Sequence, residues 1–374
     1  MSLVLTEDQE LIAKTARDFI EAESPVSRMR ALRDADDPVG FSRALWKQMA
    51  ELGWLGIPFP ETLGGAGMGF AELAVVLEAL GRNLGPEPFL SSVLLGGQAL
   101  LLAGSESQQA EWLVPMVKGE KILTLAYQEA RSRYDVSAIE TRAEKSGGGY
   151  TLRGEKVHVF DGHTADAIIV SALTPGGISL FLVPGDASGV RRERQVRLDS
   201  RGAAVVSFDS VAVGADALVG EEGQAGGVLE RVVDRATVGL CADMLGGMAQ
   251  AFDLTLDYLK EREQFGARIG TFQALKHRAA TLFIEIELSR SASMAAARAV
   301  DADDPELAKL VSLAKARCSD AFVLAGNEGV QMFGGVGMTD EYDIGLYLKR
   351  ARAAELTFGD SAWHRDRWAR LSGY

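Results

Sequence analysis

The sequence predicts an α+β protein in which two helical regions flank a region of β-strands. Apolar residues recur at helical spacing near both ends of the chain, whereas the middle consists of short β-branched runs separated by Gly, Asp and Pro. The chain has 374 residues, of which 47% are hydrophobic and 24% charged. Because this length exceeds the roughly 100 to 200 residues of a usual domain, we expect two or three packed units.

The first region, residues 1–120, is predicted to be a helical domain. Its first helix is expected over Thr6–Glu23, with Thr6 as the N-cap before an acidic first turn. The segment Ile57–Gly69 is rich in Pro and Gly and is expected to be a loop. Further helices are expected over Phe41–Leu52, Ala71–Leu80, Ser91–Ala103 and Gln108–Val117.

The middle region, residues 121–219, is predicted to be a β domain, and residues 220–374 a second helical domain. Strands are expected around Tyr150–Leu152, Ala167–Val170, Leu180–Val183 and Ala204–Phe208. Long amphipathic helices are expected over Val228–Glu263, Phe272–Val300 and Pro305–Phe333, with Asp303-Asp304-Pro305 as a helix boundary.

Composition excludes several classes of function. The formal net charge of −13 opposes nucleic acid as a partner, because phosphate backbones are held by clustered Lys and Arg. Cys241 and Cys318 lie far apart in apolar stretches, so we expect neither a disulfide framework nor a metal site, and a reducing, cytoplasmic setting. The most apolar run, Val93–Ala103, is too short to span a membrane, and Met1–Leu3 does not begin a signal peptide.

Three motifs stand out in the sequence, and the second and third contain residues suited to binding a ligand. They are Pro60-Glu61-Thr62-Leu63-Gly64-Gly65-Ala66-Gly67; Arg262-Glu263-Gln264-Phe265-Gly266 with Ile269-Gly270 and Phe272-Gln273; and Gln331-Met332-Phe333-Gly334-Gly335-Val336-Gly337 with Glu341. Arg262 offers a fork of donors that suits a diphosphate, and Phe265 can lie against a flat ring. Gly334 and Gly335 allow close approach of the backbone, and Gln331 supplies a donor and an acceptor.

A simpler interpretation of the second and third motifs stays open. Arg262 would then form a surface salt bridge, and the glycines after Gln331 would only close a helix.

Taken together, and in this order, the three motifs resemble those of the acyl-CoA dehydrogenase family over essentially the whole chain. The resemblance implies a helical domain, a β-sheet domain and a C-terminal four-helix bundle, with FAD as cofactor and an acyl-CoA as substrate. In this family a carboxylate removes the α-proton of the thioester while the β-hydride passes to the flavin. The family also implies an oligomer and an electron-transfer flavoprotein as electron acceptor.

The sequence departs from the family at the catalytic base. An ungapped count from the glycine motif brings the usual glutamate position to Phe358, and the alternative position on the preceding helix to Ala236. Asp243 lies two helical turns beyond Ala236 and is a weak candidate for a relocated base, although a helix-surface pairing is favoured for it. The other nearby carboxylates are Asp234, Glu230, Glu355 and Asp360.

The β domain departs from the family as well. Where the family has small residues against the flavin, this chain has Gln128-Glu129-Ala130-Arg131-Ser132-Arg133-Tyr134-Asp135. At the family's tryptophan and Thr or Ser positions it has His158 and Phe160. His158 is a possible proton donor, but a structural role is favoured for a strand histidine among apolar neighbours.

The departures are not random. In homomeric members one subunit supplies some flavin contacts, and its neighbour supplies the rest across the interface. The positions that act across the interface are intact, and we call them the in-trans set: Arg262, Phe265, Gln273, Gln331, Gly334 and Gly335. The positions that act within one subunit have diverged, and we call them the in-cis segments: 128–134, 158–160 and Phe358.

The pattern suggests a chain that completes the flavin site of a different, base-bearing subunit, as in heteromeric acyl-CoA dehydrogenases for steroid side chains or dicarboxylic acids. Two alternatives remain. One is a self-sufficient homo-oligomer with a relocated base such as Asp243, and the other is an acyl-CoA-binding scaffold without redox chemistry.

Overall fold

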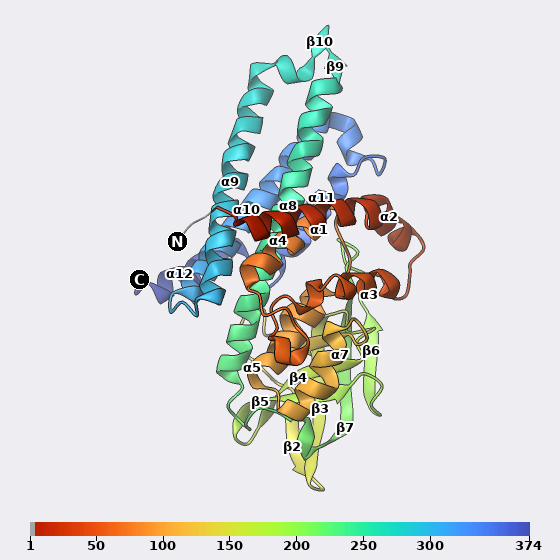
Figure 1. The fold of residues 1–374 in the computed structure, drawn as a ribbon, viewed down its shortest axis with the longest axis vertical. Coiled ribbons are helices and arrows are strands. Elements are labelled where there is room, and N and C mark those ends of the chain that lie inside the picture. Colours follow the sequence, from red (N-terminus) through yellow and green to blue (C-terminus); the bar gives the residue numbers. More distant parts are fainter. Residues whose placement is uncertain (1–3) are drawn as a thin grey trace. The chain divides into compact units, whose positions relative to one another are not determined.

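A computed structural model describes residues 4–374, and its elements follow the predicted order of helices, strands and helices (Figure 1). The chain forms two compact units, which are described separately. Unit 1 comprises the residues up to Ala31, Gly69–Gly85 and Thr237–Tyr374, and unit 2 comprises Leu32–Met68 and Pro86–Ala236. The predicted boundaries at residues 120 and 219 divide the chain differently, and that three-part division stays a prediction.

Unit 1 begins with α1 (Glu7–Glu23), which starts directly after the predicted N-cap. The Thr6 hydroxyl accepts the Gln9 N–H, and the Gln9 side chain accepts the Thr6 N–H, so the first turn has both partners of a capping box. The next helices are α2 (Val26–Asp34) and α4 (Phe70–Arg82). The Asp301 carboxylate accepts the N–H groups of Phe70 and Ala71 at 2.6 and 3.1 Å, which caps α4 from a distant part of the chain.

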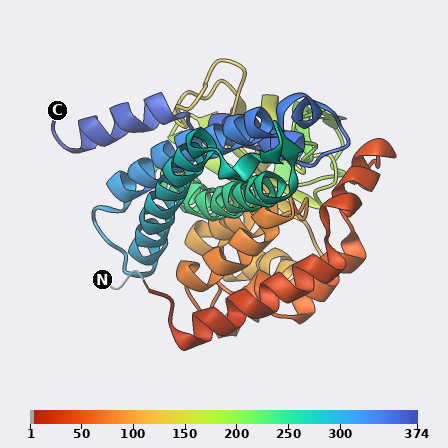
Figure 2. The same ribbon diagram turned by 90° about the horizontal axis from the view of Figure 1, so that it is seen from above.

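The long helices of unit 1 confirm the periodicity of the sequence. They are α9 (Gln273–Asp301), α10 (Leu307–Phe333) and the larger part of α8 (Gly226–Glu261), and α11 (Ile344–Leu356) and α12 (Ser361–Leu371) follow. In both ribbon views α9 and α10 run side by side (Figures 1 and 2). Helix α8 crosses α4 at a contact where a Cβ on Gly246 would lie 1.9 Å from the Glu78 carbonyl oxygen.

Unit 2 contains an eight-stranded mixed sheet. The order along the sheet is β6-β7-β3-β2-β4-β5-β8, with β1 paired to β4 in parallel. Most other pairs are antiparallel, and β3 and β7 form the longest pair. The strands are β1 (Leu123–Ala126), β2 (Arg142–Ser146), β3 (Gly149–Phe160), β4 (Ala167–Thr174), β5 (Gly177–Pro184), β6 (Val190–Arg194), β7 (Ala203–Gly214) and β8 (Leu218–Val219).

Short helices of unit 2 pack against this sheet. The π-helical segment η3 (Phe89–Gly97) contacts β1, where the Ser92 hydroxyl donates to the Leu123 carbonyl at 3.0 Å and accepts the Leu123 N–H at 3.0 Å. The remaining helical segments are α3 (Arg43–Glu51), η1 (Trp54–Gly56), η2 (Glu61–Leu63), α5 (Gln98–Ala103), α6 (Glu106–Gln108), η4 (Gln109–Leu113), α7 (Val114–Val117) and η5 (Ala215–Ala217).

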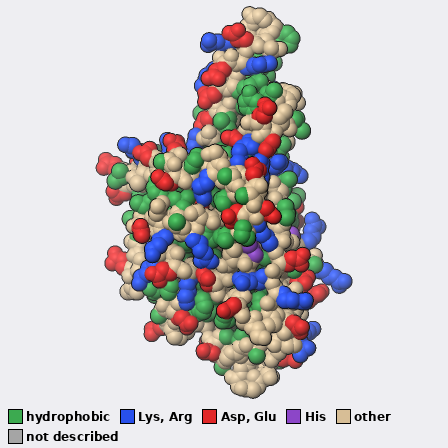
Figure 3. Space-filling model, turned by 90° about the vertical axis from the view of Figure 1, so that its right-hand side faces the viewer, with side chains coloured by type: hydrophobic (Ala, Val, Ile, Leu, Met, Phe, Trp, Pro, Cys, Tyr) green, Lys and Arg blue, Asp and Glu red, His purple; other side chains and the backbone are tan. Residues whose placement is uncertain are grey.

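Acidic and basic side chains are interspersed over the face in Figure 3 rather than gathered into one basic patch. In the part of the chain that the structure describes, every helix is too short or too polar to cross a membrane. Within the same residues, His, Cys, Asp and Glu side chains form no group of three or more that would suit a metal ion. Cys241 and Cys318 are buried free thiols.

Candidate functional site

The Arg262 motif forms a hairpin at the junction of α8 and α9. Strands β9 (Glu263–Gln264) and β10 (Ala267–Arg268) pair in antiparallel fashion around a turn at Phe265 and Gly266, both of which have positive φ. Glycine adopts this conformation freely, whereas Phe265, at φ 56°, does so at a cost. The Phe265 side chain is 92% exposed and touches Phe272 edge-on at 6.2 Å between ring centroids. The turn therefore presents a bare aromatic ring.

An aromatic cluster joins this hairpin to the glycine motif. Tyr258, one helical turn before Arg262, stacks on Phe333 with 4.2 Å between ring centroids and 12° between the planes, and Tyr342 packs edge-on against both rings. Phe333 immediately precedes Gly334 and the short helix η7 (Gly334–Met338). The second and third sequence motifs thus lie at the same end of the helical unit.

The glycine motif leaves its backbone open. Gly334 ends α10 with φ 70°, and a Cβ on Gly334 or Gly335 would meet no heavy atom within 4 Å. Gly337 differs, because a Cβ there would lie 2.7 Å from the Val330 carbonyl oxygen. Gly334 therefore does close a helix, as the simpler interpretation holds, and it also exposes main chain that a ligand can approach.

The polar side chains of the in-trans set are exposed and have no internal partner. Within residues 4–374, the Arg262 guanidinium forms no salt bridge, and the side-chain amides of Gln273 and Gln331 form no hydrogen bond. The neighbouring Arg268, in contrast, lies 3.9 Å from the Glu263 carboxylate. The salt bridge that the simpler interpretation assigned to Arg262 is therefore not present in this part of the chain.

At Phe358, which the ungapped count aligns with the family's usual base position, the structure has a buried aromatic ring. Phe358 is 4% exposed and adopts φ 60° just after α11. The buried Lys315 amine donates to the carbonyl oxygens of Glu355 and Gly359 at 3.0 and 2.7 Å. His364 Nε2 lies 3.1 Å from the Phe358 carbonyl oxygen. Side chains of α10 and α12 thus hold the turn from both sides.

Burial governs the charges of these two residues. Burial lowers the pKa of Lys315 to about 8. Burial and the charges of Lys315 and Arg367 lower the pKa of His364 to about 3, so its imidazole is neutral at pH 7. Since a carbonyl oxygen only accepts, Nε2 of this neutral ring carries the proton. The neutral His364 ring therefore supplies no acidic proton at this turn.

The alternative candidates for the base on α8 are a buried alanine and a paired aspartate. Ala236 is fully buried, and Asp243 is 5% exposed. The Asp243 carboxylate lies 3.9 Å from Arg350, whose guanidinium donates to the Leu84 carbonyl oxygen at 3.4 Å. The pairing is structural, as was favoured for Asp243, but it is buried rather than on the helix surface as expected.

Four other carboxylates lie near these positions in the sequence. Asp360 caps α12 by accepting the Trp363 N–H at 2.8 Å, and Glu355 forms a 2.7 Å ion pair with Arg352. Asp234 is buried and Glu230 is exposed, both near the start of α8.

In unit 2, the segment 128–134 is bound to the protein's own backbone and side chains. The Glu129 carboxylate accepts the Lys156 amine at 2.7 Å and the N–H groups of Glu140 and Thr141 at 2.7 and 3.0 Å. Burial opposes ionisation of Glu129, but these bonds bring its pKa below the usual value. Burial lowers the pKa of Lys156 to about 8 despite the ion pair. The following Arg131 and Arg133 are exposed where the family has small residues.

The second in-cis segment in unit 2 is covered by an arginine. The Arg197 guanidinium lies 4.8 Å from the centre of the Phe160 ring, and Arg197 Nε donates to the buried Asp199 carboxylate at 3.1 Å. The His158 N–H donates to Gln195 at 3.2 Å. Partial burial and the charge of Arg197 lower the pKa of His158, so its ring is neutral at pH 7. These contacts do not favour His158 as a proton donor.

The two groups of residues differ in their fit to FAD. The in-trans set offers a free guanidinium, two free amides, an exposed ring and open glycine backbone, which together suit a diphosphate and a nucleotide base. The in-cis segments have bulky side chains in place of small ones, and the Arg197 guanidinium already lies over the Phe160 ring. Sequence reasoning missed Arg197 and Lys315, because each acts on a segment distant in sequence. It missed His364 because only the folded turn brings its ring back to the Phe358 carbonyl oxygen.

The motif after Pro60 has a structural explanation. A Cβ on Gly65 would lie 2.1 Å from the Phe59 carbonyl oxygen, so the double glycine is needed for the chain to fold back on itself. Within this motif Gly65 N–H donates to the Pro60 carbonyl oxygen at 3.1 Å, which closes the loop around η2.

Three domain families match the chain in order. Residues 6–120 match the acyl-CoA dehydrogenase N-terminal domain, residues 124–211 the middle domain, and residues 227–372 the C-terminal domain.

Named relatives cover nearly the whole chain. A probable acyl-CoA dehydrogenase, YngJ of Bacillus subtilis, is 29% identical over 98% of both chains. A chain of the ChsE4-ChsE5 complex from Mycobacterium tuberculosis is 30% identical over 100% of both chains, with a TM-score of 0.91. A chain of a variant of the Tcur3481-Tcur3483 steroid ACAD is 31% identical over 98% of both, with a TM-score of 0.88. By its domains, fold and relatives, the chain belongs to the acyl-CoA dehydrogenase family of FAD-dependent flavoproteins.

Proposed function

We propose that this chain is the base-lacking subunit of an acyl-CoA dehydrogenase and that it completes the FAD site of a base-bearing partner subunit. In this role Arg262, Phe265 and Gln331 reach a flavin that the partner holds from its other side. Gln273, Gly334 and Gly335 complete the same surface.

One observation carries the proposal. The polar groups of the in-trans set are exposed and have no partner within residues 4–374, whereas those of the in-cis segments in unit 2 are engaged internally. The position of the family's base is filled by Phe358, which has no group that can accept a proton.

FAD supplies the acceptor for the hydride that leaves the β-carbon of the acyl thioester. The residues of this chain act on binding and orientation. With FAD bound, Arg262 would hold the diphosphate with its planar fork of donors, Phe265 would lie against a flat ring, and Gln331 would supply a donor and an acceptor to the nucleotide. The partner's carboxylate removes the α-proton, since Asp243 is paired with Arg350.

The relatives support a two-subunit enzyme. The ChsE4-ChsE5 and Tcur3481-Tcur3483 structures each name two different chains, and the latter is called a steroid ACAD. We extend this to an acyl-CoA with a bulky acyl group, such as a steroid side chain, as the substrate class. An electron-transfer flavoprotein is the proposed electron acceptor, following the family.

The test is the flavin content of the chain alone and with its partner. The protein is purified alone and after coexpression with the product of a neighbouring acyl-CoA dehydrogenase gene, and FAD is released by denaturation and quantified. We expect no FAD in the chain alone and one FAD per pair of chains in the complex. One FAD per chain in the isolated protein would refute the proposal, and so would a complex whose affinity for FAD is unchanged by Arg262→Ala.

A gain-of-function control separates the proposal from the self-sufficient enzyme. Phe358→Glu places a carboxylate at the family's base position. If the chain bound FAD by itself, this change would confer dehydrogenase activity on the isolated protein. We expect the isolated variant to stay inactive and without flavin.

A further inference from the structure

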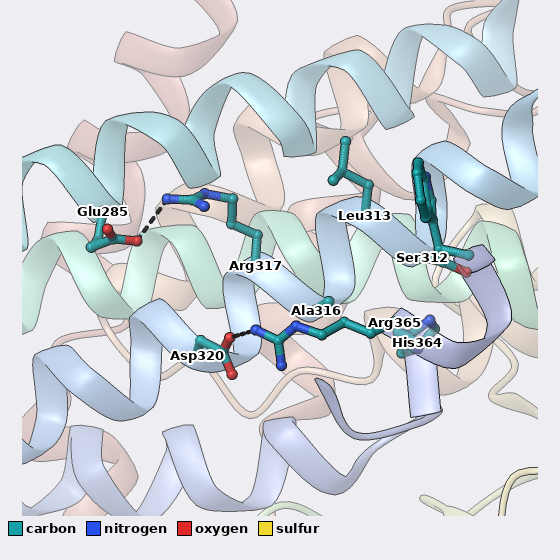
Figure 4. Close-up of a pocket in the computed structure, with 9 residues that line it drawn as sticks. Glu285, Ser312, Leu313, Ala316, Arg317, Asp320, His364 and Arg365 are labelled. Carbon is teal, nitrogen blue, oxygen red and sulfur yellow. Dashed lines mark hydrogen bonds and ion pairs between the residues drawn. The ribbon is translucent and has the colours of Figure 1, made fainter. Parts of the chain in front are cut away.

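A groove of about 260 Å³ runs along α10 between α9 and α12. Ser312, Leu313 and Ala316 of α10 form its floor, Glu285 of α9 lies on one wall, and Trp368 of α12 lies on the other (Figure 4). All three helices belong to the same compact unit. The groove is therefore a property of one rigidly packed helical layer.

The charged side chains of the groove neutralise one another. Arg317 donates to Glu285 at 2.6 Å, which joins α10 to α9, and Arg365 pairs with Asp320, which joins α12 to α10 (Figure 4). The groove thus has two positive and two negative groups. Because each charge already has a partner, the groove suits an uncharged ligand better than an ion.

His364 borders the groove and is only 1% exposed. A Cβ on Gly359 would lie 2.7 Å from the His364 Nε2 and 3.0 Å from its Cδ2, so this edge of the ring faces the turn at residues 358 and 359. Nε2 lies 3.1 Å from the Phe358 carbonyl oxygen, to which it donates. The opposite edge carries Nδ1, which has no hydrogen-bond partner within residues 4–374.

The unpartnered Nδ1 is an acceptor. The His364 imidazole is neutral at pH 7, because burial lowers its pKa to about 3, and its one proton is on Nε2. A buried acceptor without a partner is unfavourable, and a ligand that brings a donor removes that cost. The groove therefore selects for a ligand with a hydrogen-bond donor.

We propose that the groove binds a small uncharged alcohol or phenol whose hydroxyl donates to His364 Nδ1. An apolar cavity of about 150 Å³ holds benzene, so the volume of the groove suits a ligand of about ten non-hydrogen atoms. Leu313 and Trp368, which are 46% and 39% exposed, supply apolar surface for the body of such a ligand.

The site is separate from the surface that the proposed function uses. Gln273 of the in-trans set begins α9, and Glu285 stands twelve residues later, roughly 18 Å along the helix axis. Binding here depends neither on FAD nor on a partner subunit. Its effect is on the turn after α11, because the ligand holds the imidazole that donates to the Phe358 carbonyl oxygen.

The experiment compares two probes, 4-ethylphenol and 4-ethyltoluene, which have the same shape and the same number of non-hydrogen atoms and differ in one hydroxyl. Their dissociation constants for the chain purified alone are measured by isothermal titration calorimetry at pH 7. Wild type is expected to bind one 4-ethylphenol per chain and to bind it at least as tightly as 4-ethyltoluene. A groove without an acceptor would prefer 4-ethyltoluene, because burial of an unpaired hydroxyl is unfavourable.

Three variants locate the site. Ala316→Met fills the floor of the groove and should abolish binding of both probes, whereas Ala280→Met, at an exposed alanine of α9 outside the groove, should leave both unchanged. His364→Phe keeps a ring and removes the acceptor. It should shift the ratio of the two dissociation constants by roughly 10-fold toward 4-ethyltoluene. Far-UV circular dichroism checks that each variant is folded.

Four outcomes would overturn the inference. They are the absence of binding of 4-ethylphenol to wild type, tighter binding of 4-ethyltoluene than of 4-ethylphenol by wild type, unchanged binding in Ala316→Met, and an unchanged ratio in a folded His364→Phe. If His364→Phe does not fold, the wild-type ratio and the Ala316→Met variant still decide. All of these measurements are made without FAD, so their failure leaves the proposed function untouched.

Discussion

The ion pair between Lys156 and Glu129 should fasten the segment 128–134 to the sheet. The Lys156 amine is fully buried and contacts the Glu129 carboxylate at 2.7 Å, the Ser171 hydroxyl at 3.0 Å and the Tyr127 carbonyl at 3.4 Å. Lys156→Met removes the only cation of this group and leaves a buried carboxylate. Breaking one partner of such a pair costs about 3 to 5 kcal/mol. Because two backbone N–H groups still bond Glu129, we expect the lower end, about 3 kcal/mol, at pH 7.

The double variant decides whether the pair or the packing matters. In Lys156→Met with Glu129→Gln no charge remains buried, so we expect a loss below about 1.5 kcal/mol and a coupling energy of at least about 1.5 kcal/mol. The sign of the pH dependence follows from Glu129, whose pKa is lowered in the wild type. Its stabilisation is present at neutral pH and is lost in acid, so the single variant should approach wild type as the pH falls.

Equilibrium urea unfolding at pH 7 and at about pH 3.5, below the usual pKa of a glutamate, followed by far-UV circular dichroism, measures these differences. Two results would refute the reasoning. One is a loss below about 1 kcal/mol for Lys156→Met at pH 7. The other is a double variant as unstable as the sum of the two single variants.

Three further predictions test other features. Arg262→Ala should weaken FAD binding by the two-subunit complex roughly 10- to 100-fold, and Arg262→Lys less, as measured by flavin fluorescence titration. Gly246→Ala should lower the free energy of unfolding by about 2 to 3 kcal/mol, because its Cβ meets α4, whereas Gly227→Ala, with open space around it, should be neutral in the same urea assay. Burial raises the pKa of Asp161 to about 6, so its contribution to stability falls as the pH rises from about 4 to about 6. The free energy of unfolding of Asp161→Asn should therefore rise relative to that of wild type by up to about 3 kcal/mol from pH 4 to pH 7, as measured by thermal unfolding. A difference between the two proteins that does not depend on pH would contradict this.

The long elements of the fold were predictable because their signal is local. The predicted helix Pro305–Phe333 is observed as α10, Leu307–Phe333, and the predicted N-cap Thr6 is confirmed. The strand around Tyr150 was predicted too short, since polar residues after Leu152 continue β3 on its exposed side. Strand β6 was missed because it is nearly all arginine and glutamate and lies at the sheet edge, where no alternation is required.

In the candidate site, too, local motifs were predictable from the sequence and long-range contacts were not. Arg262, Phe265 and Gly334 were recognisable because short motifs contain them. The stacking of Tyr258 on Phe333, which brings two of these motifs to the same end of the helical unit, was not recognisable from the sequence. The stacking of Arg197 on Phe160 depends on contacts between residues far apart in sequence, and no local pattern indicates it. Sequence therefore predicted which residues are available, and the structure added which of them are already engaged.

The turn at Phe358 has a consequence for how such a protein can change its chemistry. Lys315 donates hydrogen bonds to the carbonyl oxygens of Glu355 and Gly359, and His364 donates to that of Phe358. These bonds involve the backbone and do not depend on which side chain residue 358 carries. The backbone of this turn is therefore held independently of which side chain stands at residue 358. Substitution of residue 358 alone can therefore remove or restore a proton acceptor while the backbone of the turn is kept. Related subunits can in this way come to differ in whether they carry the base.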